Sequence, residues 1–186
     1  MKKTNLVGFE SAKAAQISAY FAAMEGRAIS KLKLIKLIYL AERAFLQKFG
    51  DSMLYDEMFS FKDGPICSST LNGLDEKLDV SVWNRYVKRL SSRGILSNMG
   101  LDRDQYDEIS DAEWEILNLV WHEFGWMTAS QIRNYTHRHC PEYTEVPSGR
   151  VPISFYDILK AVGDQNALER SEDIQSYRRS QALLEV

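Results

Sequence analysis

The sequence predicts a mainly α-helical protein: a compact helical domain with a long central helix and a small region that forms either a β-ribbon or a plain loop. Apolar residues recur every three or four positions in several segments, which is the period of an amphipathic helix. Most of these segments begin near Ser or Thr and end at Gly, as helices commonly do. With 186 residues, 45% of them hydrophobic, the chain can bury one ordinary core.

Two helices are expected in the first fifty residues. The first covers residues 11–24 and is ended by Gly26. The second begins at Ser30, which can cap it, and ends at Gly50. We expect the second helix to cross the core with a buried stripe made of Leu34, Leu37, Ile38, Ala41 and Phe45.

Polar residues of the second helix should mark its outer face. Lys33, Lys36 and Glu42 lie between the apolar positions, and we expect them to face water or a partner. With Lys31, the two lysines can form a basic rim that attracts an acidic partner, although a solvated face explains the lysines taken alone.

The next segment predicts a short extended stretch and a tight turn. Residues 52–61 follow no helical period, and the turn is expected at Lys62-Asp63-Gly64-Pro65. Ser68 or Ser69 can then cap a short helix that reaches about Leu78.

Signals between residues 79 and 107 are weak. Three apolar residues predict one further helical turn, namely Trp83, Tyr86 and Leu90. Val87 and the run Gly94-Ile95-Leu96 leave a small strand pair and a plain loop equally open.

Three more helices are expected in the second half. Two start at capping boxes, Ser110 with Glu113 and Thr128 with Gln131. Gly125 ends the first, Pro141 stops the second, and Ser154 can cap a third. We expect residues 1–163 to form the helical domain and residues 164–186 to form a polar C-terminal extension that is helical and loosely docked.

Charge and cysteine content favour a cytoplasmic protein. The formal net charge is −3 and the pI is about 5.7, which disfavours broad binding to nucleic acid or anionic lipid. Two distant cysteines, Cys67 and Cys140, do not suggest a disulfide framework and are expected to be buried or inert thiols. Neither a signal peptide near Lys2 and Lys3 nor a membrane span is expected, because no sustained apolar run is present.

The sequence carries only weak signals for a metal site or for catalysis. A zinc site would draw on His137, His139 and Cys140 with Glu142 or His122. On a helix His137 and His139 point about 200° apart, which favours a structural role for them over a metal site. We therefore expect no cofactor, no metal and no catalytic residue, and a protein that is not an enzyme.

A DNA-binding regulator with a helix-turn-helix is the main alternative function, with residues 110–139 as the two helices, and a metal-dependent enzyme is the lesser alternative. The second helix offers side chains that can reach bases or phosphates: Gln131, Arg133, Asn134, Thr136 and Arg138. Direct DNA binding is nevertheless disfavoured, because the chain is acidic and the same helix pair is common as core packing.

Several separated motifs resemble one protein family. They are LKLIKLIYLAERAFLQKFG, MFSFKDGPI, ISDAEWEIL and MTASQIRNYTH. In order and spacing they resemble the Panacea-domain family, also called SocA-like. The family pattern KLQKLLYLA, an extended segment, a Gly-Pro turn and a later Thr-His correspond here to Leu32, Lys36, Leu37 and Tyr39, to Phe59, Gly64 and Pro65, and to Thr136 and His137. Ile35 replaces the usual Gln of the pattern, and Ser60 a frequent Ala.

The resemblance implies an antitoxin of a bacterial or phage toxin–antitoxin pair, which neutralises a cognate protein toxin by direct binding. Members are also described as phage-associated proteins or as adaptors that present a toxin to a protease. It therefore implies a cognate toxin as partner, and a protease or chaperone as a further one.

The matched motif positions are the candidate partner-binding or structural residues: Lys36, Tyr39, Phe59, Gly64, Pro65, Thr136 and His137. Lys36 and Tyr39, about one helical turn apart, are expected to be exposed and to contact the partner or hold the turn. His137 is expected to be a buried polar group that ties its helix to the Gly64-Pro65 turn, since a buried imidazole needs hydrogen-bond partners.

Overall fold

The structure, a computed structural model, describes residues 8–184. The residues considered for a signal peptide, including Lys2 and Lys3, lie outside the described residues. So do the last two residues of the expected C-terminal extension.

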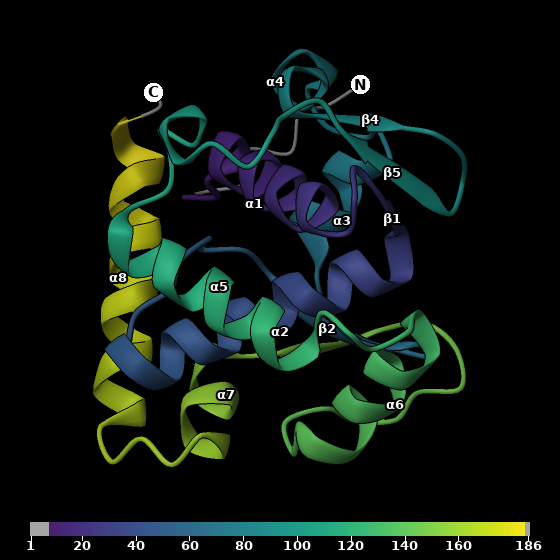
Figure 1. Cartoon of the computed structure of the whole chain (residues 1–186). Helices are drawn as coiled ribbons and strands as arrows, with labels where there is room; N and C mark the ends of the chain where they lie inside the picture. Colours follow the sequence, from purple (N-terminus) through teal and green to yellow (C-terminus); the bar gives the residue numbers. More distant parts are fainter. Residues whose placement is uncertain (1–7, 185–186) are drawn as a thin grey trace.

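Helices make up most of the described chain, which confirms the mainly α fold class (Figure 1). The α-helices are α1 (Ser11–Met24), α2 (Lys31–Phe49), α3 (Ser68–Leu74), α4 (Val80–Tyr86), α5 (Asp111–Phe124), α6 (Ala129–His139), α7 (Phe155–Ala161) and α8 (Ala167–Leu184). A single 3-10 turn, η1 (Arg103–Gln105), precedes α5 within the described part of the chain.

Two small antiparallel sheets accompany the helices. One has the strand order β1 (Ala28–Ser30), β5 (Gly94–Ser97) and β4 (Val87–Arg89), so the strand pair is right and the plain loop is wrong. The other has the order β3 (Gly64–Cys67), β2 (Met58–Phe61) and β6 (Val151–Ile153). Lys62 and Asp63 form the turn of the β2–β3 hairpin, as predicted, whereas Gly64 and Pro65, also expected in the turn, begin β3.

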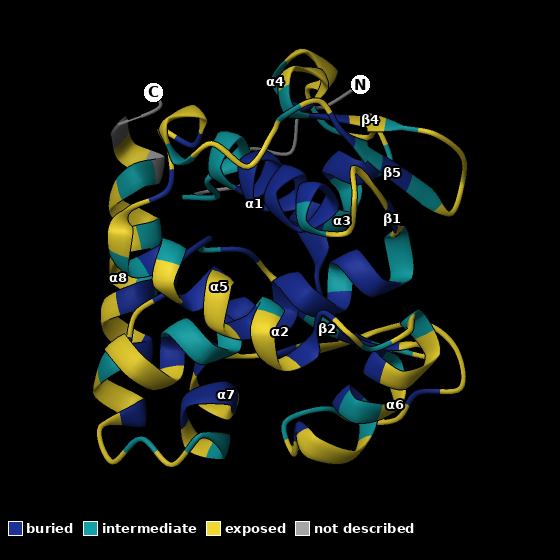
Figure 2. Ribbon diagram, in the orientation of Figure 1, coloured by how far each residue is buried: buried dark blue, intermediate teal, exposed yellow. Residues whose placement is uncertain are grey.

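Helix α2 packs against other elements on several sides: α1, α5, α6, α7, β1 and β3. Four members of its predicted stripe, Leu34, Leu37, Ile38 and Ala41, are fully buried. Much of the α2 ribbon has the colour of buried residues in Figure 2. Burial of a Leu or Ile side chain contributes about 1.5–3 kcal/mol. The fifth, Phe45, is only partly buried and lies against Phe49, while Leu46 is fully buried in the core.

The expected outer face of α2 is wrong. Lys33, Lys36 and Glu42 are 5%, 0% and 0% exposed. Lys33 donates hydrogen bonds to Glu25 on one side and to the Gly125 carbonyl on the other, and so joins the C-terminal ends of α1 and α5. Because neighbouring elements cover this face too, the basic rim does not exist as predicted; Lys31 alone of these lysines is partly exposed.

Glu42 is a buried anchor for the loop that follows α2. Its carboxylate accepts hydrogen bonds from the Ser52 hydroxyl and from the Met53 and Leu54 amides, the amides at 3.2 and 3.1 Å. Burial raises the pKa of Glu42 to about 7, although these hydrogen bonds favour its charged form.

The predicted helix ends are largely confirmed. Gly50 has φ +68° and ends α2 in the left-handed conformation. The boxes at Ser110 and Thr128 both form, and Ser154 caps α7 in the same way.

The N-terminal cap of α3 is supplied from a distance. Neither Ser68 nor Ser69 caps this helix; the buried Asp56 accepts hydrogen bonds from the Ser69 and Thr70 amides at 2.8 Å. The helix ends at Leu74, before the expected limit near Leu78.

Two of the three residues expected in the next helical turn lie in α4. Trp83 is buried and donates a hydrogen bond to Ser11 of α1, and Tyr86 is partly buried. Leu90 was expected to make apolar contact but lies past β4 and is 53% exposed.

Helix α8 lies along one side of the molecule and packs on α7 (Figure 1). It buries Ala167 and Ile174, and its Tyr177 ring lies 4.4 Å from the ring of Tyr55. Among the described residues, no helix combines the length and the apolar character that crossing a bilayer requires.

Candidate functional site

A line of polar residues runs along one face of α2. Lys36, Tyr39 and Arg43 follow one another at intervals of three and four residues, which places them on the same side of the helix. This side faces β3, α6 and the segment after α6. These polar residues of α2 therefore lie next to several of the candidate residues at the matched motif positions.

Lys36 lies at the β2–β3 hairpin. Its ammonium group donates a hydrogen bond of 2.8 Å to the Pro65 carbonyl, the one acceptor that the described residues place within reach. Burial lowers the pKa of Lys36 to about 7, while Asp63 raises it and Arg133 lowers it further. The prediction that Lys36 is exposed is wrong, and its role in holding the turn stays a prediction that the hydrogen bond to Pro65 supports.

Gly64 lies against both Lys36 and α6. Its φ is +98°, a conformation that side chains rarely adopt. A β-carbon here would lie 2.8 Å from Lys36 Nζ, 3.0 Å from Thr136 Oγ1 and 3.1 Å from His137 Cδ2. The glycine thus lets the hairpin approach α2 and α6 together.

Thr136 and His137 close this cluster from α6. Thr136 is fully buried, and its hydroxyl donates to the Arg133 carbonyl at 2.8 Å. The His137 ring lies 4.4 Å from the Tyr143 ring. We call Lys36, Gly64, Pro65, Thr136 and His137 the hairpin cluster.

His137 is only partly buried as a residue, but its Nε2 atom is buried and has no hydrogen-bond partner among the described residues. Burial and the positive charges of Arg133 and Lys36 lower the pKa of this imidazole, and a hydrogen bond with the Asp63 backbone partly offsets them. A β-carbon at Gly64 would lie 3.1 Å from His137 Cδ2, so the ring is beside the turn, and its predicted role as a tie between α6 and the turn stays a prediction.

Tyr39 joins a second network beside the hairpin cluster. It is fully buried, so the prediction of an exposed contact residue is wrong. Its hydroxyl donates to Glu142 Oε1 at 2.8 Å, and Arg43 Nε donates to the same oxygen at 2.8 Å. Glu142 Oε2 is buried without a partner among the described residues. The sequence offered Glu142 only as a metal ligand and gave no signal for Arg43.

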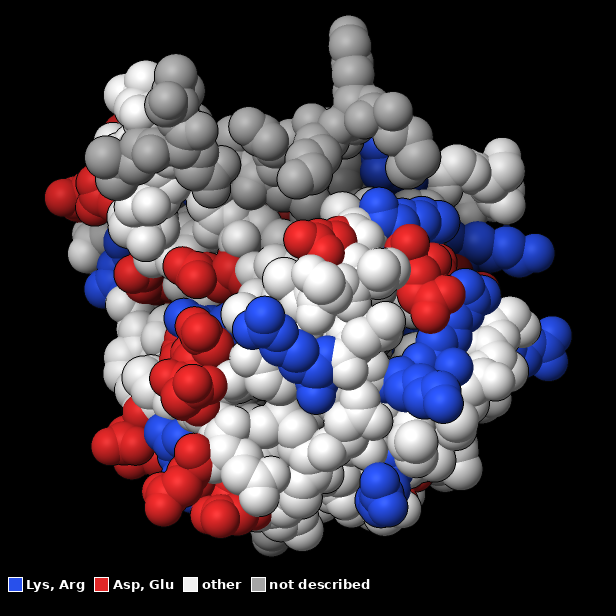
Figure 3. Space-filling model, turned by 90° about the horizontal axis from the view of Figure 1, so that it is seen from above, with Lys and Arg blue, Asp and Glu red and all other residues white. Residues whose placement is uncertain are grey.

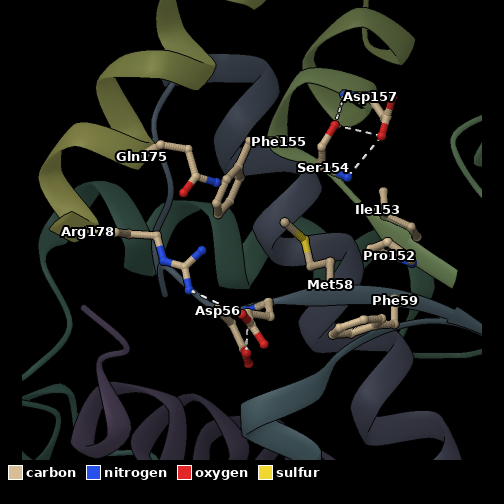
Figure 4. A pocket seen from close by; sticks show the side chains of 11 residues that line it. Asp56, Met58, Phe59, Pro152, Ile153, Ser154, Phe155, Asp157, Gln175 and Arg178 are labelled. Atoms are coloured by element: carbon tan, nitrogen blue, oxygen red, sulfur yellow. Dashed lines mark hydrogen bonds and ion pairs between the residues drawn. The ribbon is translucent and has the colours of Figure 1, made fainter. Parts of the chain in front are cut away.

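Phe59 lies apart from the cluster, on the other end of β2. It lines a cavity of about 300 Å³ between β2, the start of α7 and α8, together with Met58, Pro152 and Arg178 (Figure 4). The Arg150 guanidinium lies 4.2 Å from the centre of its ring. The structure therefore brings five of the seven candidate residues together, places Tyr39 next to them and separates Phe59.

Neither cysteine is poised as a nucleophile. Both are about 2% exposed. Burial raises the pKa of Cys67 well above its usual value and that of Cys140 to about 12, so both thiols stay protonated near neutral pH.

The residues considered for zinc binding do not form a cluster in the described part of the chain. His139 stacks on Tyr135 with ring centres 4.5 Å apart. Across residues 8–184, no three His, Cys, Asp or Glu side chains lie close enough to hold a metal ion.

The helix pair α5–α6 uses part of its expected DNA-contacting surface internally. Thr136 is buried, and Arg133 binds Asp63 at 3.1 Å and the Lys62 carbonyl at 3.3 Å. Gln131, Asn134 and Arg138 remain exposed.

The hairpin cluster adjoins a surface groove of about 750 Å³, a size typical of ligand sites. Lys36 and Gly64 lie at its base. Its walls come from the start of α2, the β2–β3 turn, α3, the β4–β5 turn and residues 147–149.

A family model described as antitoxin SocA-like, Panacea domain, matches residues 34–143, more than half of the chain. The chain belongs to this family. Comparison with curated proteins and with solved structures finds no significant match.

The Panacea domain contains both buried networks. Its matched region begins in α2, includes the β2–β3 hairpin, and ends at Tyr143, which packs on His137. The helices α1, α7 and α8 lie outside the matched Panacea region but pack on it or on one another.

Proposed function

We propose that this Panacea-domain protein is a cytoplasmic antitoxin that neutralises a cognate protein toxin by direct binding and catalyses no reaction. The family match over residues 34–143 carries the proposal. The architecture supports it, because Lys36 and Glu142 fasten three separate segments of the Panacea domain into a preformed surface. A rigid surface loses little conformational entropy when it binds.

The chemistry of the site agrees with binding rather than bond breaking. The two thiols are protonated, Lys36 donates to the Pro65 carbonyl, and Arg43 pairs with Glu142. Neutralisation needs only that the toxin's active surface is covered or held in an inactive form.

Co-expression tests the proposal. The open reading frame beside this gene is placed under an inducible promoter with a foreign ribosome-binding site, so that repression by DNA binding cannot rescue growth. We expect its product to arrest growth and the full chain to restore it, with both proteins co-eluting after purification. A harmless product, or arrest that the full chain does not relieve, would refute the proposal.

The level of the toxin separates the two modes of neutralisation that the family suggests. Direct neutralisation leaves the amount of toxin unchanged while growth recovers. If the protein acts as an adaptor for a protease or chaperone, the toxin disappears in cells and persists in a purified mixture. Immunoblots of the same cultures distinguish these outcomes.

A further inference from the structure

The groove beside the hairpin cluster combines apolar walls with basic rims. Its half-buried apolar lining consists of Leu32, Ile35, Phe61 and Leu71. Lys62 projects from the β2–β3 turn and Arg93 from the β4–β5 turn, so exposed cations stand on two different walls. Lys36 lies at the base of the groove but is fully buried and donates to the Pro65 carbonyl.

The carboxylates of the groove are already paired. Asp63 binds Arg133 at 3.1 Å, and Asp75 binds Lys31 at 2.5 Å and Lys77 at 3.5 Å. Within residues 8–184, no ion pair joins Lys62 or Arg93 to a carboxylate. The groove therefore carries an excess of positive charge in a protein whose net charge is negative.

The positive charge of the groove is part of a separation of cationic and acidic side chains across the molecule. Seen from above, Lys and Arg gather on the side where the β4–β5 hairpin lies, and Asp and Glu gather on the side of α8 (Figure 3). Exposed acids on α8 include Glu169, Glu172 and Asp173. Such a field steers an acidic partner toward the groove side of the molecule.

We infer that this groove binds an acidic peptide segment of the partner protein, with apolar side chains against Leu32, Ile35, Phe61 and Leu71 and carboxylates at Lys62 and Arg93. The inference rests on the proposed function, because it names the surface through which the antitoxin would hold its toxin. Buried apolar contacts ringed by complementary charges are what such an interface requires. A nucleic acid would use the cations but not the apolar walls.

Peptide titration tests the groove without knowledge of the toxin. The probe is a fluorescent dodecapeptide with Leu and Phe on one helical face and Glu on the other, compared with versions that carry Gln or Lys in place of each Glu. The full chain should bind the Glu peptide best and the Lys peptide worst. The double variant K62E/R93E should bind the Glu peptide at least ~10-fold more weakly.

A matched control separates the groove from overall charge. Lys88 is exposed on β4 and does not line the groove. K88E should bind the Glu peptide as the wild type does, apart from a small loss from steering. I35A, a change at a half-buried position that should keep the fold, is expected to weaken binding of all three peptides. Equal binding of the Glu and Lys peptides, or equal effects of K88E and R93E, would overturn the inference.

The same variants in the co-expression assay distinguish the two proposals. If the wild type rescues growth and K62E/R93E rescues equally, the groove is not the toxin site although the proposed function stands. If the wild type itself fails to rescue, the proposed function fails and the peptide titration still decides the groove. Competition of the peptide by single-stranded DNA at equal strength, or a dimer that R93E dissociates, would also contradict the inference.

Discussion

At the scale of single residues, the molecule depends on polar side chains placed inside it. Lys36, Glu42 and Asp56 are each 0–1% exposed, and each bonds to the backbone of a segment far along the chain. Buried polar groups are costly unless they are paired, so these bonds fix where the connected segments lie.

Lys36 should make stability depend on pH. Its pKa is about 7 when folded and 10.5 when unfolded, so between these values the unfolded chain binds a proton that the folded chain does not. Stability should therefore rise with pH, by up to about 1.4 kcal/mol per pH unit from this residue. Urea unfolding of the wild type and K36M at pH 7, 8 and 9 measures this, and the variant should lack that rise. If the free energies of unfolding of the wild type and K36M change with pH in the same way, Lys36 is not buried in its neutral amine form.

Gly64 should tolerate alanine poorly for two reasons. Its positive φ costs a side chain about 1–3 kcal/mol, and overpacking against Lys36 and Thr136 adds a further ~1–3 kcal/mol. Gly26 has a similar φ of +93° with nothing within 4 Å of a β-carbon, so G26A isolates the backbone cost. Thermal and urea unfolding should rank G64A below G26A. If G64A and G26A lose the same free energy of unfolding, the space between Lys36 and Thr136 does not restrict the side chain at position 64.

At the scale of elements, helix α3 depends on a cap that lies outside its own sequence. Asp56 accepts from the Ser69 and Thr70 amides and from the Thr70 hydroxyl, all at 2.8 Å. The negative charge also lies at the positive end of the helix dipole. The loop before β2 and the helix after β3 are thereby joined across the hairpin that carries Gly64 and Pro65.

Removal of this cap should cost more than removal of the nearest serine. D56A leaves buried amides without partners, and we expect it to lower the free energy of unfolding by at least ~2 kcal/mol. S68A, which removes a hydroxyl that makes no capping bond, should cost less than ~1 kcal/mol. Chemical denaturation of both variants gives the comparison. Similar values for the two would show that the cap is not set by Asp56.

At the scale of the whole molecule, charge and packing are distributed unevenly. Cations gather toward the β4–β5 side, which includes the groove, and acids toward α8 (Figure 3). Helix α8 also covers apolar surface, since Ile174 and Ala167 are buried. The Arg170 guanidinium packs where α2 ends at Gly50.

The expected boundary at Gly163 can be tested by truncation. If α8 is part of the cooperative fold, removal of residues 164–186 should lower the free energy of unfolding by ~3–5 kcal/mol, from the loss of Ile174 and the Tyr55–Tyr177 ring contact. I174A in the full chain should lose ~2–4 kcal/mol, whereas E172A at an exposed position should change little. A truncated chain as stable as the full one would instead make residues 164–186 an independent extension.

Helix positions could be predicted from the sequence because their signals are local. The apolar period of α1 and α2, the capping boxes at Ser110 and Thr128, and the left-handed Gly50 each involve residues within a few positions of one another. The family motifs likewise selected Lys36, Gly64, Pro65, Thr136 and His137, which the fold brings together.

The surroundings of the polar residues were decided only by the tertiary structure. A lysine between apolar positions of a helix looks exposed in sequence, yet Lys36 bonds to Pro65, 29 positions away, and Tyr39 bonds to Glu142, 103 positions away. The groove has the same origin, because its walls come from five separate segments. The sequence by itself determined the helices and the family. The packing of distant segments determined which charged side chains are buried and which stay exposed to a partner. The physical reason is that burial depends on neighbours that local spacing does not specify.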